Sequence, residues 1–165
     1  MTTAMDGATA EIDVPVDPVT AFQLYVTRPG RRHPTGGQSG APAEIVYESF
    51  AGGRWYERAG DGREYEWGRI LEWDPPHRLV LAWMVGASLG EWAFDPDLAH
   101  ASRAEITFEP TERGTRVRVE HTGFEAHGPG AASIRRGVSR GWVEDLHDLA
   151  RAAGRHDLPR PTRQE

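Results

Sequence analysis

The sequence predicts an α+β fold in which a curved antiparallel β-sheet of about six to seven strands wraps around a long C-terminal α-helix. Segments of alternating apolar and polar residues, separated by Gly, Pro and Asp-Gly turns, occupy the middle of the 165-residue chain. A strong helical pattern closes the chain. Because an antiparallel sheet with one apolar face needs a cover, we expect the last helix to lie across its concave face.

The N-terminal part predicts one strand and one helix. Residues 9–14 (TAEIDV) form the strand, and the helix spans about Pro18 to Thr27. Asp17 offers an N-cap oxygen, and Pro18 suits the first helical position. Three apolar residues recur at helical spacing and predict its buried face: Val19, Phe22 and Val26. Residues 28–43 are rich in Gly and Pro, which predicts a long loop that acts as a lid or is mobile.

The strands that follow are separated by turn signals. Gly52-Gly53, Asp61-Gly62, Pro75-Pro76 and Glu112-Arg113-Gly114 mark the turns. The predicted strands are 44–49, 54–58, 64–73, 78–84, 103–110 and 115–124. Residues 85–102 are irregular, although Trp92 and Phe94 share a face and could extend a strand.

The final helix, predicted over residues 131–154, carries one apolar stripe at spacings of four and three. The stripe comprises Ile134, Val138, Trp142, Leu146, Leu149 and Ala153. Gly154 suits the helix end. We therefore expect a single domain over residues 9–153, with flexible termini at 1–8 and 155–165.

Composition excludes several functional classes. Cysteine is absent, which excludes disulfides and thiol chemistry and is typical of a cytoplasmic protein. The net charge of −6 argues against nucleic-acid binding. The N-terminal residues lack the basic and apolar regions of a secretory signal, and no apolar run is long enough to insert into a membrane.

Several short motifs occur in a familiar order. They are Gly52-Gly53-Arg54, Asp61-Gly62, Trp67-Gly68, the run DPPHRL at 74–79, Trp83, the run GTRV at 114–117, the run HTGF at 121–124, Gly141-Trp142 and Leu146. Together they resemble the START-like (SRPBCC, Bet v-like) superfamily, and within it the branch named after the activator of the heat-shock protein 90 ATPase. The resemblance spans about residues 9–153. It implies a helix-grip fold with a cavity between the sheet and the last helix. Relatives often carry a Trp-Trp-Pro cluster where this chain has Arg31-Arg32-His33-Pro34, so we expect a more open or more polar cavity end there.

Six residues are the candidates for lining a ligand cavity: Trp55, Trp67, Trp83, Phe108, His121 and Trp142. Each is also a plausible core residue, because aromatic side chains dominate core packing. Strict alternation turns five residues of the predicted strand 64–73 inward, unless a bulge at Gly68 reverses the order beyond it: Tyr65, Trp67, Arg69, Leu71 and Trp73. Gly137 and Gly141 weaken the last helix, which is typical of close approach to a strand or a ligand.

The titratable residues do not specify a reaction. His121 at the end of an apolar strand face is either a hydrogen-bonded core group or a proton-transfer residue. Its separation from His127 is poor evidence for a metal site, and no cofactor motif is present. Glu57, Glu66 and Glu91 would serve as an acid or base if any of them faced the cavity.

Three functions remain open. The favoured hypothesis is binding of a small hydrophobic or aromatic ligand in the cavity. The alternatives are a polyketide cyclase or hydrolase-type enzyme and a co-chaperone-like activator of a heat-shock chaperone ATPase, both of which rest on the resemblance. The edge of the sheet near the first strand could also pair in a homodimer.

Overall fold

The computed structural model describes residues 6–28, 44–88 and 91–157. Seven strands form one antiparallel sheet in the order β1-β9-β8-β5-β4-β3-β2. Their bounds are β1 Ala8–Val14, β2 Glu44–Tyr47, β3 Arg54–Arg58, β4 Glu64–Asp74, β5 Arg78–Trp83, β8 Ser102–Thr111 and β9 Gly114–Thr122. The helices are α1 Pro18–Thr27 and α2 Ala131–Asp157, with 3₁₀ segments η1 Leu98–His100 and η2 Phe124–Gly130.

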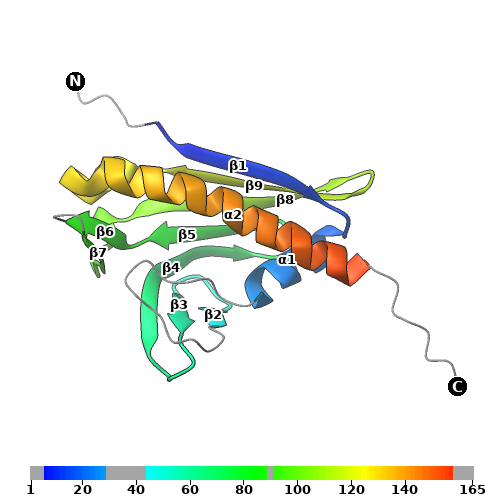
Figure 1. Ribbon diagram of the computed structural model, residues 1–165, viewed down its shortest axis with the longest axis horizontal. Coiled ribbons are helices and arrows are strands. Elements are labelled where there is room, and N and C mark those ends of the chain that lie inside the picture. The colour runs from blue at the N-terminus through cyan, green and yellow to red at the C-terminus, as the bar shows by residue number, and fades with distance from the viewer. Residues whose placement is uncertain (1–5, 29–43, 89–90, 158–165) are drawn as a thin grey trace, which may run out of the picture.

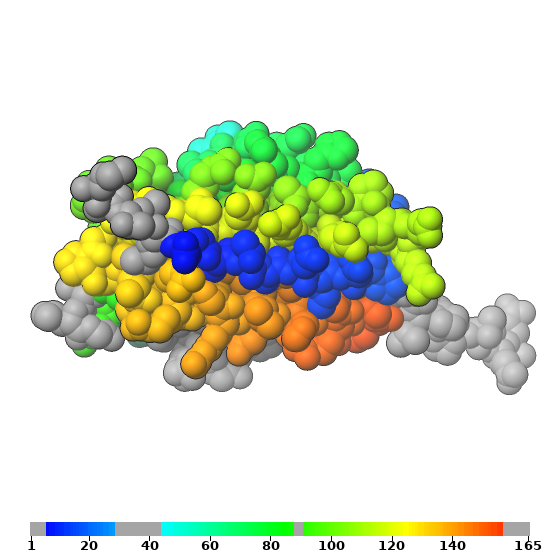
Figure 2. Space-filling view, turned by 90° about the horizontal axis from the view of Figure 1, so that it is seen from above, coloured from blue at the N-terminus to red at the C-terminus, as the bar shows by residue number. Residues whose placement is uncertain are grey.

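Helix α2 lies along the concave side of the curved sheet, as the helix-grip prediction requires (Figure 1). Its apolar stripe is buried: Ile134, Val138, Trp142, Leu146, Leu149 and Ala153. The first strand, β1, runs beside α2 and pairs with β9, and Figure 2 shows β1 lying between these two segments on one face. The predicted fold and the predicted core face of the last helix are therefore confirmed.

Helix α1 begins as its sequence predicts. The side chain of Asp17 accepts a hydrogen bond of 2.9 Å from the backbone N–H of Thr20 and so caps the helix. The buried face of α1 is formed by Ala21, Phe22 and Tyr25. Val19 is 60% exposed, so its predicted place on the buried face is wrong; the helix turns its side chain to solvent.

Two β-bulges in β4 determine which of its side chains face α2. The strand has an extra residue against β3 at Trp67 and another against β5 at Leu71. Each bulge shifts the alternation by one residue, so that Trp67, Ile70 and Trp73 pack with the core. Leu71 is 42% exposed and Ile70 is fully buried. Strict alternation therefore fails for Leu71 and Ile70, which is the outcome expected if a bulge near Gly68 interrupts it.

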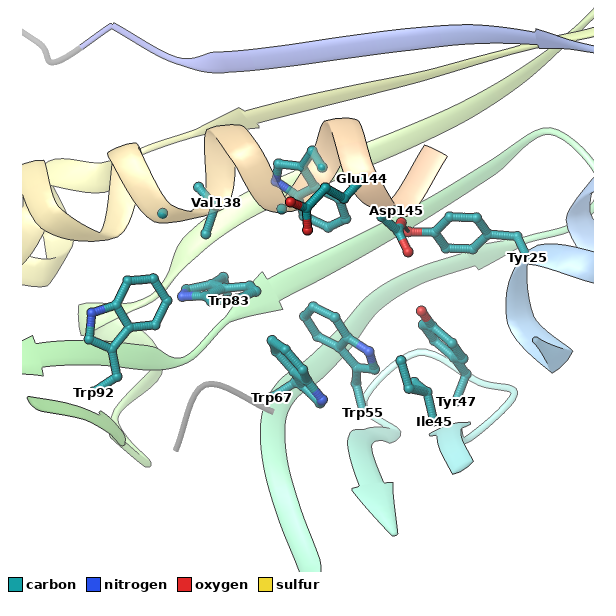
Figure 3. Close-up of a pocket in the computed structure, with 13 residues that line it drawn as sticks. Tyr25, Ile45, Tyr47, Trp55, Trp67, Trp83, Trp92, Val138, Glu144 and Asp145 are labelled. Carbon is teal, nitrogen blue, oxygen red and sulfur yellow. Dashed lines mark hydrogen bonds between the residues drawn. The ribbon is translucent and has the colours of Figure 1, made fainter. Parts of the chain in front are cut away.

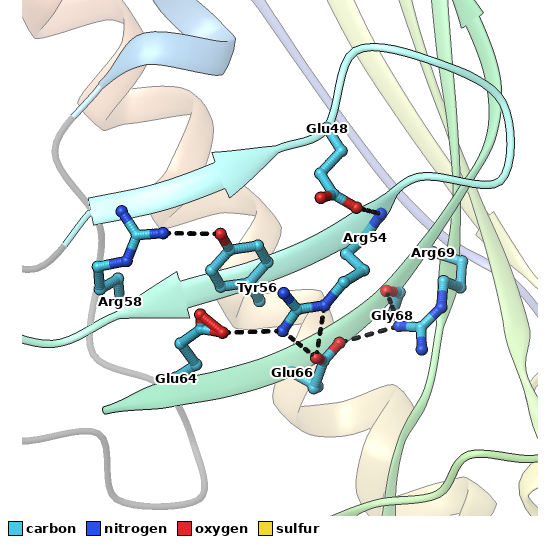
Figure 4. A network of polar contacts seen from close by, with 8 residues as sticks. All are labelled: Glu48, Arg54, Tyr56, Arg58, Glu64, Glu66, Gly68 and Arg69. Carbon is cyan, nitrogen blue, oxygen red and sulfur yellow. Dashed lines mark hydrogen bonds and ion pairs between the residues drawn. The ribbon is translucent and has the colours of Figure 1, made fainter. Parts of the chain in front are cut away.

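Charged residues cover the outer surface of β3 and β4 (Figure 4). Arg54 forms ion pairs with Glu64 and Glu66, and Glu66 also binds Arg69 at 2.9 Å. Arg54 stacks on the ring of Tyr56 at 4.1 Å. Strict alternation predicts that Arg69 faces inward. The bulge at Trp67, two residues earlier, places Arg69 in this outer network instead.

Segment 85–102 is more regular than expected. Val85–Ser88 (β6) and Glu91–Phe94 (β7) form a separate two-stranded sheet, so Trp92 and Phe94 do not extend the main sheet. Helix α2 continues to Asp157, three residues beyond the expected end at Gly154. The predicted loop and the Arg31–Pro34 departure fall on residues 29–43, outside the described residues. No helix in the described parts of the chain has the length and apolar character of a membrane span.

Candidate ligand cavity

A cavity of about 320 Å³ lies between α2 and the strands on one side of the sheet. Figure 3 shows side chains from α1, β2, β3, β4, β5 and β7 facing the helix across it. The lining residues are Tyr25, Ile45, Tyr47, Trp55, Trp67, Trp83, Trp92, Gly137, Val138, Gly141, Trp142, Glu144 and Asp145. Its volume falls at the lower end of the range of about 300–1,000 Å³ that is typical of small-molecule sites.

The sheet side of the cavity is a wall of aromatic rings. Tyr47 and Trp55 are stacked with centroids 6.1 Å apart, and Trp55 and Trp67 are stacked at 5.6 Å. Trp83 meets Trp67 edge to face at 5.2 Å. These residues come from four neighbouring strands, β2, β3, β4 and β5. The result is a rigid apolar surface with ring faces and edges exposed to one space.

Trp92 closes the cavity beside α2, where a glycine accommodates it. A Cβ atom on Gly137 would overlap the ring of Trp92, so a side chain there would displace the indole. Trp92 also meets Trp83 edge to face, with centroids 6.4 Å apart. The predicted role of Gly137 in a close approach between helix and strand is thus explained by a tryptophan from β7.

One end of the cavity is polar. The hydroxyl of Tyr25 donates to a carboxylate oxygen of Asp145 at 2.8 Å. Arg28 donates to the other carboxylate oxygen and to the main-chain carbonyl of Asp145, both at 2.8 Å. Burial raises the pKa of the Tyr25 and Tyr47 hydroxyls, and the Asp145 carboxylate raises the pKa of both further. Both tyrosines are therefore neutral near pH 7.

Four of the six candidate residues line the cavity: Trp55, Trp67, Trp83 and Trp142. Phe108 does not, because α1 covers it: Phe22 packs on its ring at 5.0 Å and Tyr25 at 5.9 Å. His121 does not either, since the rings of Trp142 and Phe124 pack against it at 5.9 and 4.3 Å. The inward orientation predicted for both residues is right, but they lie in the core behind the lining.

His121 belongs to a chain of hydrogen bonds that leads away from the cavity wall. The indole N–H of Trp142 donates to His121 Nδ1 at 3.0 Å. The imidazole of His121 therefore carries its proton on Nε2, which donates to Ser102 Oγ at 2.6 Å. The Ser102 hydroxyl then donates to Nε2 of His127 at 2.7 Å. Both nitrogens of His121 are engaged, so the chain gives no support to a proton-transfer role for it in the cavity.

This hydrogen-bond chain predicts that the protein loses stability in mild acid. Burial, with a smaller effect from His127, lowers the pKa of His121 to about 3, whereas the unfolded value is about 6.5. Below pH 6.5 the unfolded chain therefore binds the extra proton, and the free energy of unfolding should fall by up to about 1.4 kcal/mol per pH unit. Urea denaturation at pH 7.5, 6 and 5 measures this slope.

His121→Gln should reduce that pH slope, because it removes the buried imidazole that the folded protein keeps neutral. A free energy of unfolding that is constant from pH 7.5 to 5 would contradict the assignment of a neutral, buried His121.

The predicted carboxylates do not enter the cavity. Glu57 is fully buried but is not among the lining residues, and Glu66 lies in the outer network. Glu91 is exposed on β7. No cluster of three or more potential metal ligands occurs within residues 6–28, 44–88 and 91–157.

The sequence interpretation missed the polar end of the cavity. Tyr25 lies on the buried side of α1 and Tyr47 alternates with Ile45 on β2, which is a signal that could have identified them. Asp145 follows Trp142 by three residues and therefore lies on the same side of α2. An acidic residue beside an apolar helical stripe is the feature that marks this position.

Comparison with known proteins identifies the family. The family model of the Activator of Hsp90 ATPase homolog 1-like protein matches residues 39–154. The chain therefore belongs to this family, as its motifs suggested. A search of curated protein sequences finds no match.

Solved structures share the fold over most of the chain. Protein MLL2253 from Mesorhizobium loti is 22% identical over 93% of this chain and 100% of its own, with a TM-score of 0.62. An anthrahydroquino-gamma-pyrone synthase, Txn09, complexed with SUM, is 30% identical over 84% of this chain and 90% of its own, with a TM-score of 0.53. DynU16, a putative protein in the dynemicin biosynthetic locus, is 18% identical over 89% of this chain and 46% of its own, with a TM-score of 0.57.

Proposed function

We propose that this protein binds a flat aromatic small molecule in the cavity between α2 and the sheet. The observation that carries the proposal is the lining itself, to which five of the six tryptophans contribute their indoles. Flat rings can stack on or meet these indoles edge to face, and such pairs contribute about 0.5–1.5 kcal/mol beyond their buried area. The space is large enough for a ligand and is bounded by side chains that are held in place by their neighbours.

The ligand should carry polar groups at one end. Tyr25, Tyr47 and Asp145 lie together at one end of the cavity, whereas Trp83 and Trp92 bound the other. A ligand with polar groups there would add hydrogen bonds to the tyrosine hydroxyls, whereas a wholly apolar ligand would exclude water from this end without replacing its hydrogen bonds, which is costly. An aromatic frame with oxygen substituents on one side matches both ends.

Filling the cavity from α2 tests this proposal. No atom of the described residues lies within 4 Å of where a Cβ at Gly141 would stand, so Gly141→Leu should extend into the cavity. Calorimetric titration with 2-(hydroxymethyl)anthracene should show binding to the unchanged protein and at least a ten-fold weaker affinity for this variant.

Gly154→Leu is the matched control, because Gly154 lies on the same helix, outside the lining, with no described atom within 4 Å of its Cβ position. Both substitutions replace a helical glycine and should raise helix stability by about 1 kcal/mol, so weaker binding would not reflect unfolding. Equal affinity in all three proteins would show that the probe does not enter the cavity.

A second candidate function is catalysis on such a ligand, which is favoured by the 30% identity to Txn09, whose name is that of a synthase. The side chains that would contact a substrate are Tyr25, Tyr47 and Asp145, while His121 is separated from it by Trp142. Mass spectrometry of an aromatic polyketide incubated with the protein would detect turnover. Recovery of the unchanged compound, with binding intact, would favour binding without catalysis.

A further inference from the structure

Two hydrogen-bond donors lie next to one another on the sheet side of the cavity. The indole N–H of Trp55 is buried and has no hydrogen-bond partner among the described residues, although the Trp55 side chain lines the cavity. The Tyr47 ring is stacked on Trp55, and the polar groups of Trp55 and Tyr25 lie close enough to the Tyr47 hydroxyl to lower its pKa, against the larger opposing effect of burial, although no hydrogen bond of good geometry joins the Trp55 N–H to it. An indole N–H can only donate, and leaving it unsatisfied in the interior costs about 1–3 kcal/mol.

The opposite side of the cavity determines what kind of acceptor can satisfy this pair. Glu144 and Asp145 project from α2 toward the space that Trp55 and Tyr47 border, as Figure 3 shows. A ligand carboxylate or sulfonate also accepts hydrogen bonds, but it would lie beside these two acidic side chains, which disfavours it even though Arg28 pairs with Asp145. A neutral carbonyl oxygen accepts from two donors without adding charge.

We infer that the cavity selects aromatic ketones and quinones, whose carbonyl oxygen accepts hydrogen bonds from Trp55 Nε1 and the Tyr47 hydroxyl. The inference rests on the proposed function, because it assumes that a flat aromatic ligand occupies the cavity. It adds the chemical class of that ligand and assigns Trp55 and Tyr47 as the residues that determine specificity. The stacked rings hold the two donors in place before the ligand arrives.

A pair of probes that differ in their carbonyl groups tests the inference. Calorimetric titration should show that 2-(hydroxymethyl)anthraquinone binds about ten-fold tighter than 2-(hydroxymethyl)anthracene, since each neutral hydrogen bond contributes a few-fold in affinity. Anthracene-2-carboxylate should bind no better than the uncharged anthracene. An equal affinity for the two uncharged probes would overturn the inference and leave the proposed function standing, whereas failure of both to bind would contradict the proposed function and the inference together.

Variants that each remove one hydrogen-bond donor show which residues produce the preference for the anthraquinone over the anthracene. Trp55→Phe and Tyr47→Phe should each reduce the preference for the anthraquinone to about three-fold, and the double variant should abolish it. The affinity for the anthracene should stay within about two-fold, which also reports that the cavity is intact. If Trp55→Phe binds neither probe, Tyr47→Phe decides the question.

Tyr56→Phe is the matched control, because Tyr56 lies in the outer network, where its hydroxyl accepts a hydrogen bond from Arg58 at 2.9 Å. It should keep the full preference for the anthraquinone. A preference that survives in the Trp55→Phe and Tyr47→Phe double variant would overturn the assignment of these two donors.

Discussion

Replacing Gly68 with alanine is expected to lower the free energy of unfolding by about 3 kcal/mol or more. Gly68 lies in β4 next to the bulge at Trp67 and pairs with Trp83 of β5. A Cβ atom at this position would overlap the main-chain carbonyl oxygen of Ala82. Because the obstacle is backbone in the middle of a sheet, the clash can be relieved only by separating β4 from β5. Urea denaturation followed by circular dichroism measures the loss.

Gly86→Ala provides the control for this substitution. Gly86 lies in β6, and no described atom lies within 4 Å of the position its Cβ would take. Its stability should therefore stay within about 1 kcal/mol of the unchanged protein. If both alanine variants had the same stability, the close approach of β4 and β5 at Gly68 would be contradicted.

Asp145→Ala should have the second largest effect, a loss of about 3 kcal/mol in the free energy of unfolding. The side chains of Arg28 and Asp145 are 10% and 14% exposed, so their ion pair is largely shielded from water. Removing the carboxylate leaves a buried guanidinium without its counter-charge and takes the hydrogen-bond acceptor from Tyr25. The higher helix propensity of alanine offsets less than 1 kcal/mol of this.

An exposed ion pair supplies the comparison. Arg116 and Asp13 form one whose side chains are 48% and 66% exposed, and Asp13→Ala should cost less than about 1 kcal/mol. Replacing both members of the buried pair, as in Arg28→Met with Asp145→Leu, should recover much of the stability lost in Asp145→Ala. A loss no larger for Asp145→Ala than for Asp13→Ala would contradict the strength assigned to the Arg28 contact.

The parts of the fold that follow from local pattern could be predicted from the sequence. The stripe from Ile134 to Ala153 has one periodicity over its whole length, so its burial under the sheet followed directly. Strand β4 could not be predicted in the same way, because its bulges at Trp67 and Leu71 depend on the register with two neighbouring strands. The β6–β7 pair lies in a segment with weak alternation, where tertiary contacts decide the structure.

The sequence could predict which side chains of the candidate site face the inner side of the sheet, but not which of them border the cavity. Phe108 and His121 are buried, as their choice as cavity candidates requires, but the sequence could not tell whether a cavity or another side chain lies in front of them. The polar end depends on contacts between Tyr25 or Arg28 and Asp145, which are 120 and 117 residues apart in the chain. A local sequence pattern cannot predict such a contact, because these residues come together only when the chain folds.

The order in which the chain is synthesised determines when α2 can cover the apolar face of the sheet. The ribosome releases all strands before the helix that covers them, and β1 pairs with β9 only after more than a hundred further residues have been made. During translation the tryptophan-bearing face of the nascent sheet is therefore without its cover. Slow, non-local pairing of this kind exposes apolar surface to aggregation, so folding should depend on rapid docking of α2 once that helix has been made.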